Sequence, residues 1–467
     1  MRFDPRILLR LASVLFVVGG CAHAPPDGDF ADGVAVAGID EPIQFIGTGM
    51  PTDAAAEDGS VLMTMEDAVR RALRSSPTIQ ADIAEVRAAL ADARQARLIP
   101  NPVLSVAVRL PEGGGTPVIE AGLAADLVSL LLRPRRISAA DNRLRAASAE
   151  ALTTVLDQLA EVQERYVTVQ ALDAQAGILE LRRTLIQRLL KLARARVEAG
   201  ESSRLDVITL DAERVSLDVE IAQAASERRE QRLALARLIG QPSGRTNWQL
   251  SPWTPADPAA GDEMQWVRAA LEHRPEIQAQ RWDLAALGDD AALARFAGLD
   301  GADVGVDAER DDAWSVGPAM STPLPLLDWG QQRRAKAVAQ RLAARHRLTQ
   351  TRRRIVEEVR RAVESLAAAQ AVLRQVQAEL IPLADQRVQQ AEAAYKNGFA
   401  DVTAVLLAEQ ESQAARSKLI ELQQKAASAR YRLHRAVGGP GVAASVAATA
   451  TTRSTSTQPA SQRTEQP

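Results

Sequence analysis

The stretch VRRALRSSPTIQA, from Val69 to Ala81, returns 198 residues later as VRAALEHRPEIQA, from Val267 to Ala279. A single offset that survives at several separated places indicates an internal duplication. The fold is therefore expected to consist of two copies of one structural unit. The same offset of 198 relates three further pairs of positions: Gly200 and Gly398, Gly240 and Gly438, and Arg135-Arg136 and Arg333-Arg334.

The duplication divides the chain into ordered segments. We expect the first repeat over residues 61–241 and the second over residues 263–440, joined by a proline-rich linker over residues 242–262. Each repeat is predicted to contain a helix, two strands, a very long helix, a sharp turn and a returning helix. The Ala-, Ser-, Thr- and Gln-rich tail over residues 441–467 is predicted to be disordered. The fold class is thus mainly α with a small β part.

The first helix of each repeat has clear boundary signals. Thr64 and Asp67 have the spacing of a capping box at the start of a helix over about residues 65–98. Pro77 interrupts this helix early, as Pro275 does in the second repeat.

The long helices carry the strongest periodicity. No proline occurs in residues 138–199, and only Pro382 occurs in residues 331–397. Apolar residues recur every seven positions in both segments, which predicts coiled-coil hairpins. A helix of about 60 residues is roughly 90 Å long. Each long helix is expected to end in a glycine tip, at Gly200 and at Gly398, because glycine permits the left-handed helix cap.

The hydrophobic period changes to two over residues 103–127 and 302–322. This alternation predicts two β-hairpins with strands of about eight to ten residues, the length with which a tilted strand crosses a bilayer. Alternation alone leaves a small soluble hairpin on each repeat as an alternative. One face of the predicted strands is apolar, and the other carries the acidic residues Glu120, Asp126, Asp303, Asp307 and Glu309.

Composition excludes several classes of function. The 467 residues include 56 Lys and Arg against 59 Asp and Glu, and this balance argues against a polycation that binds nucleic acid. Aromatic residues make up only 3%, which fits closely packed Ala- and Leu-rich helices. The single cysteine rules out an intrachain disulfide and a multi-cysteine metal site, and the four histidines lie far apart. We expect no enzyme, no metal site and no cofactor beyond an N-terminal lipid.

The N-terminal segment has the pattern of a processed leader. Arg2, Arg6 and Arg10 precede an apolar run that ends in Val-Gly-Gly-Cys21, which resembles the bacterial lipoprotein box. Residues 1–20 are then a signal peptide, Cys21 is the lipidated residue, and residues 21–60 form an extended leader. An ordinary signal peptide is the alternative. No later segment has 18 consecutive apolar residues.

Four membrane-length strands cannot stand alone in lipid, because the backbone groups of their edges would be unpaired. Closure requires further copies of the chain. Three copies give twelve strands with an open lumen, whereas eight strands tend to be filled by side chains. We therefore expect a homotrimer whose strand acids line the lumen and whose helices form a tube, with Trp314 and Trp329 as candidates for the aromatic girdle.

Several short motifs resemble those of the TolC-like outer-membrane efflux proteins, and the resemblance covers about residues 62–440. The Pro-Asn-Pro and Tyr395 to Gly398 motifs resemble the CzcC- and CusC-like heavy-metal subgroup, which also carries lipoprotein-box cysteines. The motifs are the Ala-Leu-x-x-x-Pro openings that end at Pro77 and Pro275, Ile99-Pro100-Asn101-Pro102, Val316-Gly317-Pro318, Pro323-Leu324-Pro325-Leu326, Tyr395-x-x-Gly398 and Val405-Leu406.

The resemblance implies an outer-membrane homotrimer that extends into the periplasm as the exit duct of a tripartite efflux system. Its tips would dock onto a periplasmic adaptor, which connects to an inner-membrane transporter of the RND or ABC type. The matching tip residues are Ala199, Gly200, Glu201, Asn397, Gly398 and Phe399.

The sequence departs from the family pattern at the aperture. Some members carry acidic gate residues where this chain has Ala404 and Leu407, so Asp206 and Asp401 are the candidates here. A lipid-anchored periplasmic coiled-coil scaffold without a pore is the alternative function. The two apolar-faced hairpins argue against it, because a scaffold has no use for strands of bilayer length.

Overall fold

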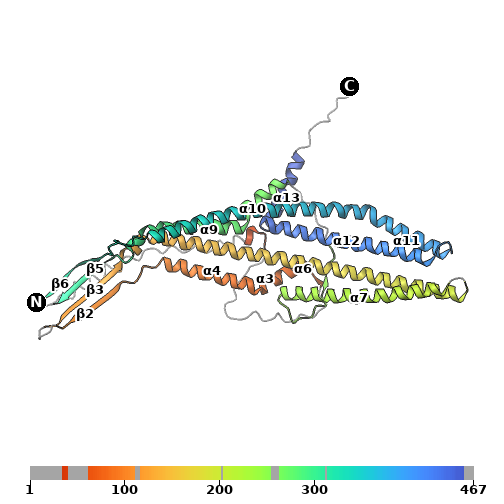
Figure 1. Cartoon of the computed structure of the whole chain (residues 1–467), viewed down its shortest axis with the longest axis horizontal. Coiled ribbons are helices and arrows are strands. Elements are labelled where there is room, and N and C mark those ends of the chain that lie inside the picture. Colours follow the sequence, from red (N-terminus) through yellow and green to blue (C-terminus); the bar gives the residue numbers. More distant parts are fainter. Residues whose placement is uncertain are drawn as a thin grey trace, which may run out of the picture. The chain divides into compact units, whose positions relative to one another are not determined.

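The computed structural model describes residues 34–39, 62–110, 116–200, 203–253, 262–310 and 313–456, with the backbone alone from residue 450 (Figure 1). The chain forms two compact units. Unit 1 includes Glu85–Ser148 and Ala279–Leu348, and unit 2 includes Ala31–Ala84, Ala149–Gln278 and Thr349–Pro467. Cys21 and Glu201 lie outside the described residues.

Unit 1 contains a four-stranded antiparallel sheet in the order β2-β3-β5-β6 (Figure 1). The predicted hairpins are confirmed: each repeat contributes two consecutive strands, and β3 pairs with β5 to join the repeats. The strands are β2 Val103–Arg109, β3 Val118–Asp126, β5 Asp303–Arg310 and β6 Trp314–Ser321.

Helical segments of unit 1 adjoin this sheet. Ala93 of α4 packs against Ala140 and Leu144 of α6, and such small side chains let two helices approach closely. Arg97 forms a bidentate ion pair with Asp141 at 2.7 and 2.8 Å between nitrogen and oxygen atoms. The elements with residues in this unit are α4 Pro77–Ala96, α5 Leu127–Leu131, α6 Arg133–Glu198, α9 Pro275–Leu293, a 3₁₀ turn Ala294–Leu299 and α10 Gln331–Gln375.

Unit 2 contains the first helices of both repeats, α3 Met65–Ser75 and α8 Glu263–His273. The predicted capping box is confirmed: the Asp67 amide donates to the Thr64 hydroxyl at 3.1 Å, and the Thr64 amide donates to the Asp67 carboxylate at 3.2 Å. Each helix is followed by one extended cap residue and then a proline, because the residue that precedes proline disfavours helical backbone.

The long helices of unit 2 follow the predicted order and pack through their heptad positions. Val155 and Val162 of α6 and Ile355 and Val359 of α10 are fully buried. A π-helical turn at Val376–Leu380 separates α10 from α11, since Pro382 cannot donate a helical hydrogen bond. The remaining helices are α7 Arg204–Leu238, α11 Ile381–Lys396 and α12 Val402–Val437. Among the described helices, none combines the length and the hydropathy that a membrane span requires.

Three predicted segments differ from the structure. Residues 441–456 of the tail are helical where disorder was expected, as part of α13 Pro440–Ser456, because alanine favours helix and Val442 and Val446 are buried. The rest of the tail lies outside the described residues. The linker contains β4 Gln249–Leu250, which pairs in parallel with β1 Leu62–Met63. Within the leader, residues 34–39 include a helical turn instead of extended chain.

Candidate functional site

The sheet of unit 1 has one polar and one apolar face. Directly paired residues share a face, and the register pairs Glu120 with Glu309 and Asp126 with Asp303. Asp307 pairs with Gly122 and lies on the same face. The structure therefore places the five predicted acidic residues on one face of a single sheet.

The apolar face is exposed to an unusual degree for large aliphatic side chains. Such a face is stable only when another apolar environment covers it. Its exposed residues include Leu104, Val106, Val108, Val304, Val306, Val316 and Met320.

Two acidic residues of the polar face make local contacts. Glu120 forms an ion pair with Arg109 of the neighbouring strand at 2.7 Å. The Asp126 carboxylate accepts a hydrogen bond from the Ser129 amide at 2.8 Å and so caps α5. Asp126 thus has a structural role that the sequence pattern did not indicate.

The outer strands of the sheet, β2 and β6, have one paired side each within the described part of the chain. Because every neighbouring pair in the order β2-β3-β5-β6 is antiparallel, β2 and β6 themselves run in opposite directions. A second copy could therefore place its β2 beside β6 and continue the antiparallel alternation. The two edges therefore have the strand directions with which several copies could join edge to edge into a closed barrel.

The two glycine tips have the expected backbone conformation. Gly200 has a φ of 73° and Gly398 a φ of 76°, in the left-handed region, and both tips are exposed. Ala199 and Asn397 are also exposed, and Phe399 exposes 86% of its surface. The Phe399 ring at this tip is therefore open to contact with another molecule.

Beneath the tips, the two helical hairpins of unit 2 pack together around Tyr395, which is 2% exposed. The guanidinium of Arg196, from the other hairpin, lies 5.1 Å from the centre of the Tyr395 ring and donates to its backbone carbonyl at 3.3 Å. Arg196 was not among the predicted site residues, because a lone arginine in an Arg-rich helix gives no signal.

The candidate aperture residues Asp206 and Asp401 both act electrostatically on Tyr395. Burial raises the pKa of the Tyr395 hydroxyl, the Arg196 guanidinium opposes this, and the two carboxylates act in the same direction as burial. Asp206 lies in the first turn of α7. Asp401 caps α12, since its carboxylate accepts a hydrogen bond from the Val402 amide at 2.7 Å.

Unit 1 also has a groove of about 1000 Å³ among α4, α6 and the end of α9. Charges of both signs line it, including Arg133, Arg136, Glu85 and Asp290. In the part of the chain that the structure describes, no group of three or more His, Cys, Asp or Glu side chains could hold a metal ion.

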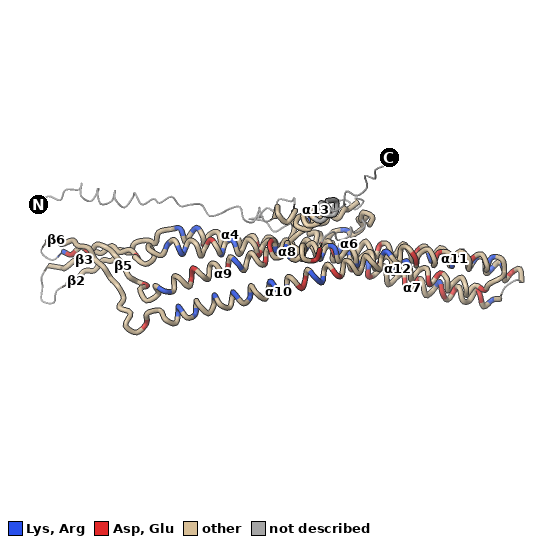
Figure 2. The backbone as a smooth tube through the Cα atoms, turned by 90° about the horizontal axis from the view of Figure 1, so that it is seen from above, with Lys and Arg blue, Asp and Glu red and all other residues tan. Residues whose placement is uncertain are grey.

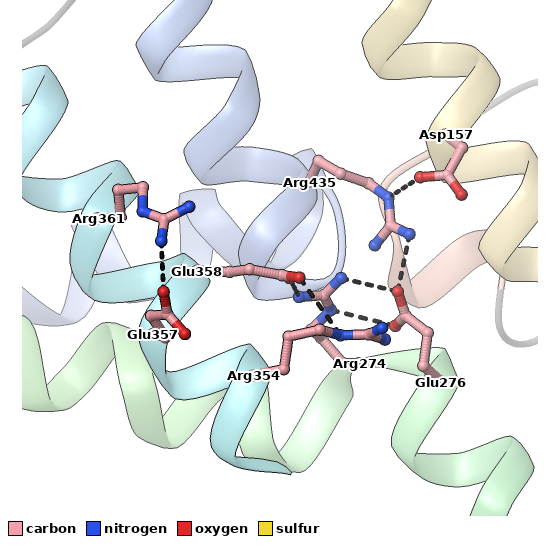
Figure 3. Close-up of polar contacts among 8 residues, drawn as sticks. All are labelled: Asp157, Arg274, Glu276, Arg354, Glu357, Glu358, Arg361 and Arg435. Carbon is pink, nitrogen blue, oxygen red and sulfur yellow. Dashed lines mark hydrogen bonds and ion pairs between the residues drawn. The ribbon is translucent and has the colours of Figure 1, made fainter. Parts of the chain in front are cut away.

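An ion-pair network with a buried centre connects residues of five helices, α6, α8, α9, α10 and α12, within unit 2 (Figure 3). Arg274, at the end of α8, donates to Glu276 at 2.7 and 3.1 Å and also contacts Glu358 of α10. Arg435 of α12 donates to Glu276 at 2.7 Å and to Asp157 of α6 at 2.5 Å. Glu276 therefore has two guanidinium partners from different helices.

The charges around Glu276 determine its protonation. Burial alone would raise the pKa of its carboxyl group, but Arg435 and Arg274 outweigh burial and lower the pKa to about 2. Arg274 and Glu276 flank Pro275 in the repeated motif, yet the first repeat has Ser76 and Thr78 there. This difference between the two repeats is the feature of the sequence that could have indicated the ion-pair network.

Comparison with known proteins gives a family match. The family model described as "Outer membrane efflux protein" matches residues 68–241 and 266–439, which together are more than half of the chain. The two matched segments follow the two repeats. The cobalt-zinc-cadmium resistance protein CzcC of Cupriavidus metallidurans is 25% identical over 287 residues, which cover 60% of this chain. The chain spans 66% of the length of that relative.

Solved structures share the fold. The outer membrane protein VceC of Vibrio cholerae superposes with a TM-score of 0.67 at 22% identity, covering 80% of this chain and 96% of VceC. The structure of CusC gives a TM-score of 0.67 at 18% identity, covering 85% of this chain and 99% of CusC. The outer membrane channel MtrE of Neisseria gonorrhoeae gives a TM-score of 0.61 at 16% identity and covers 85% of this chain.

Proposed function

The chain belongs to the outer membrane efflux protein family, and we propose that three copies of it form a passive exit duct across the outer membrane and the periplasm. The observation that carries this proposal is the open sheet of unit 1, with one exposed apolar face, one acidic face and two edges that no described strand pairs. A lipid-facing barrel wall needs these three properties together.

The number of copies follows from the size of the lumen. Three sheets of four strands give a barrel of twelve strands, which leaves an aqueous lumen, whereas eight strands leave space for side chains only. The apolar face carrying Val106 and Val316 then meets lipid, and the face carrying Glu120 and Asp307 lines the lumen. No helix has to enter the membrane.

Cross-linking between edge strands tests this closure. Val106→Cys on β2 and Val316→Cys on β6 lie on the same sheet face, and in the closed barrel they belong to adjacent strands of different copies. Neighbouring positions on β2 should be scanned to find the register. Oxidation is expected to give covalent dimers and trimers, with no larger species.

The matched control for this experiment is Val103→Cys with Val316→Cys. Val103 is on β2 but on the opposite face, so it should not cross-link. A strict monomer under all pairs would contradict the proposal and favour the lipid-anchored scaffold without a pore.

The tips are proposed to dock onto a periplasmic adaptor protein, which connects the duct to an inner-membrane transporter of the RND or ABC type. Support comes from the exposure of Ala199, Asn397 and Phe399 around two left-handed turns. Phe399→Ala is expected to reduce adaptor cross-linking in cells while the trimer still assembles. Because the curated relative is a cobalt-zinc-cadmium resistance protein, divalent metal cations are the first substrates to test.

Asp206 is the proposed acidic residue of the aperture. Asp401 is the second candidate, and its carboxylate also caps α12. Asp206→Asn should lower cation conductance of the inserted trimer, and unchanged conductance would exclude this residue. We further propose that Cys21 carries the lipid; labelled palmitate should be incorporated by the natural chain and not by Cys21→Ala.

A further inference from the structure

One end of the sheet in unit 1 has an uncommon concentration of exposed apolar side chains. The four connections between strands and helices at this end are residues 97–102, 127–132, 294–302 and 322–330. Leu327 exposes 92% of its surface and Trp329 70%. Scattered exposed leucines are normal, but several large apolar side chains exposed within the one connection 322–330 mark a surface that contacts something apolar. The other prominent members are Leu98, Leu131, Leu324 and Leu326.

Basic residues follow these apolar connections in both repeats. Arg133, Arg135 and Arg136 come after the connection that leaves β3. Arg333, Arg334 and Lys336 come after the connection that leaves β6, at the start of α10, where Lys and Arg recur along the helix (Figure 2). We call these connections and the basic residues behind them the collar. Its order, apolar next to the sheet and basic beyond, is that of a protein segment at a bilayer interface.

The carboxylates around the collar are already engaged. Arg333 forms ion pairs with Asp300 at 2.7 Å and with Asp328 at 3.6 Å. Asp289 contacts Arg135 at 3.0 Å. Arg334 and Lys336 are exposed, and no carboxylate among the described residues forms an ion pair with either of them. These two cations are therefore available to an external anion.

We propose that the collar rests in the periplasmic leaflet of the outer membrane, with its Leu and Trp side chains among the acyl chains and with Arg334 and Lys336 bound to the phosphates of anionic phospholipids. This inference rests on the proposed function, because it takes the sheet to be the membrane-spanning part. The exposed apolar face that carries Met320 continues into the connection after β6, so one apolar surface would run from the strands into the collar.

A second copy of the chain is the competing occupant. A neighbouring collar would offer apolar contacts, but its Asp300 and Asp328 are engaged by its own Arg333. Asp303 lies on the polar face of the sheet, opposite the apolar face. The acidic residues of a neighbouring collar are thus paired with that copy's own arginine, whereas a lipid phosphate supplies the negative charge that Arg334 and Lys336 lack.

The first test measures lipid preference with trimers that have already been shown to conduct. Trimers are reconstituted into vesicles of phosphatidylethanolamine with one fifth phosphatidylglycerol, extracted, and analysed for retained lipid by native mass spectrometry. We expect the natural chain to retain phosphatidylglycerol above its share of the vesicle. Arg334→Gln with Lys336→Gln should reduce the enrichment at least fivefold, since a basic residue near an anionic surface contributes about that factor.

Arg352→Gln with Arg353→Gln is the matched control, because it removes the same charge from exposed positions of the same helix outside the collar. This variant should keep the enrichment. If all three proteins retain phosphatidylglycerol equally, or if the natural chain shows no enrichment, the proposal is overturned, while the measured conductance still supports the duct. If the charge variant forms fewer trimers but those trimers keep the natural lipid preference, the result contradicts lipid binding and favours contact of the collar with a second copy of the chain.

A spin label gives an independent measurement that does not depend on the charge variants. A label at Leu327→Cys should be more accessible to oxygen, which partitions into lipid, than to a water-soluble nickel chelate. A label at the exposed Leu205→Cys in α7, far from the collar in the sequence, should show the reverse. Preferential nickel access at Leu327, or access to neither reagent, would contradict insertion of the collar into the membrane.

Discussion

Replacing Glu276 with Gln tests the buried network of unit 2 most sharply. The carboxylate accepts hydrogen bonds from both Arg274 and Arg435, and its side chain is 14% exposed (Figure 3). Glutamine keeps the size and an acceptor oxygen but removes the charge. The two guanidinium groups then remain buried with one anionic partner fewer, which is the costly way to break an ion pair.

The magnitude follows from the pKa of Glu276. Its pKa falls from the ordinary 4.5 to about 2 because Arg435 and Arg274 outweigh the effect of burial. A depression of this size corresponds to roughly 3 kcal/mol of stability at neutral pH, at about 1.4 kcal/mol per pKa unit. Because the pKa of the acid is depressed in the folded state, this contribution is complete above pH 4.5 and is lost as the pH falls toward 2. The free energy of unfolding of Glu276→Gln should therefore be about 3 kcal/mol below that of the natural protein at pH 7, and the difference should be less than half of that at pH 3.

Amide hydrogen exchange on the detergent-solubilised protein measures this local stability. Peptides from the first turns of α9 should exchange faster in Glu276→Gln by two to three orders of magnitude at pH 7, after correction for intrinsic rates. Glu357→Gln is the matched control, because Glu357 pairs with Arg361 at side-chain exposures of 65% and 74%. It should change exchange little. Equal effects of the two substitutions, or an effect of Glu276→Gln that persists unchanged at pH 3, would refute the reasoning.

Further predictions concern the packing of unit 2. Gly439 has a φ of 127°, and a Cβ there would lie 2.6 Å from the carbonyl oxygen of Ala37, so Gly439→Ala should release the leader segment, seen as faster amide exchange in that segment. Burial first, and then Arg430, lower the pKa of His434 from 6.5 to about 4, so the unfolded chain binds the proton more readily. The free energy of unfolding of the natural protein, measured with urea, should then fall by about 2 kcal/mol between pH 7 and pH 5 because of this group. The His434→Gln variant should not show this part of the decrease. Tyr166 donates to the carbonyl of Met63 at 2.7 Å, so Tyr166→Phe should cost about 1 kcal/mol and loosen β1 in amide exchange.

The order of elements could be read from the sequence because it depends on local patterns. The change to an alternating pattern at Val103 predicts a strand, and the glycines at positions 200 and 398 predict helix ends. Each of these signals lies within a few residues, and the structure contains the strand and both turns. The 198-residue offset then shows that the same order of elements occurs twice. The α13 helix was not predicted, because its formation depends on packing against distant parts of the chain. Its Ala- and Thr-rich composition is compatible with disorder, and only the burial of Val442 and Val446 against the rest of unit 2 shows that it packs.

The candidate site was predictable where it follows strand alternation. The five acids could be grouped on one face because side chains alternate along a strand. The contacts of Tyr395 with Arg196, and of Arg435 with Glu276, join residues about 200 and 160 positions apart. No pattern within one sequence predicts such pairs, since they depend on how the hairpins pack.

The central claim is that the open sheet closes with further copies into a water-filled pore. The most direct measurement is the conductance of a planar lipid bilayer to which the purified full chain is added. The account predicts discrete steps of equal size, each marking the insertion of one trimer, with currents that rise with ionic strength. A chain that associates with the bilayer and forms trimers, but never produces a conductance step, would contradict the account.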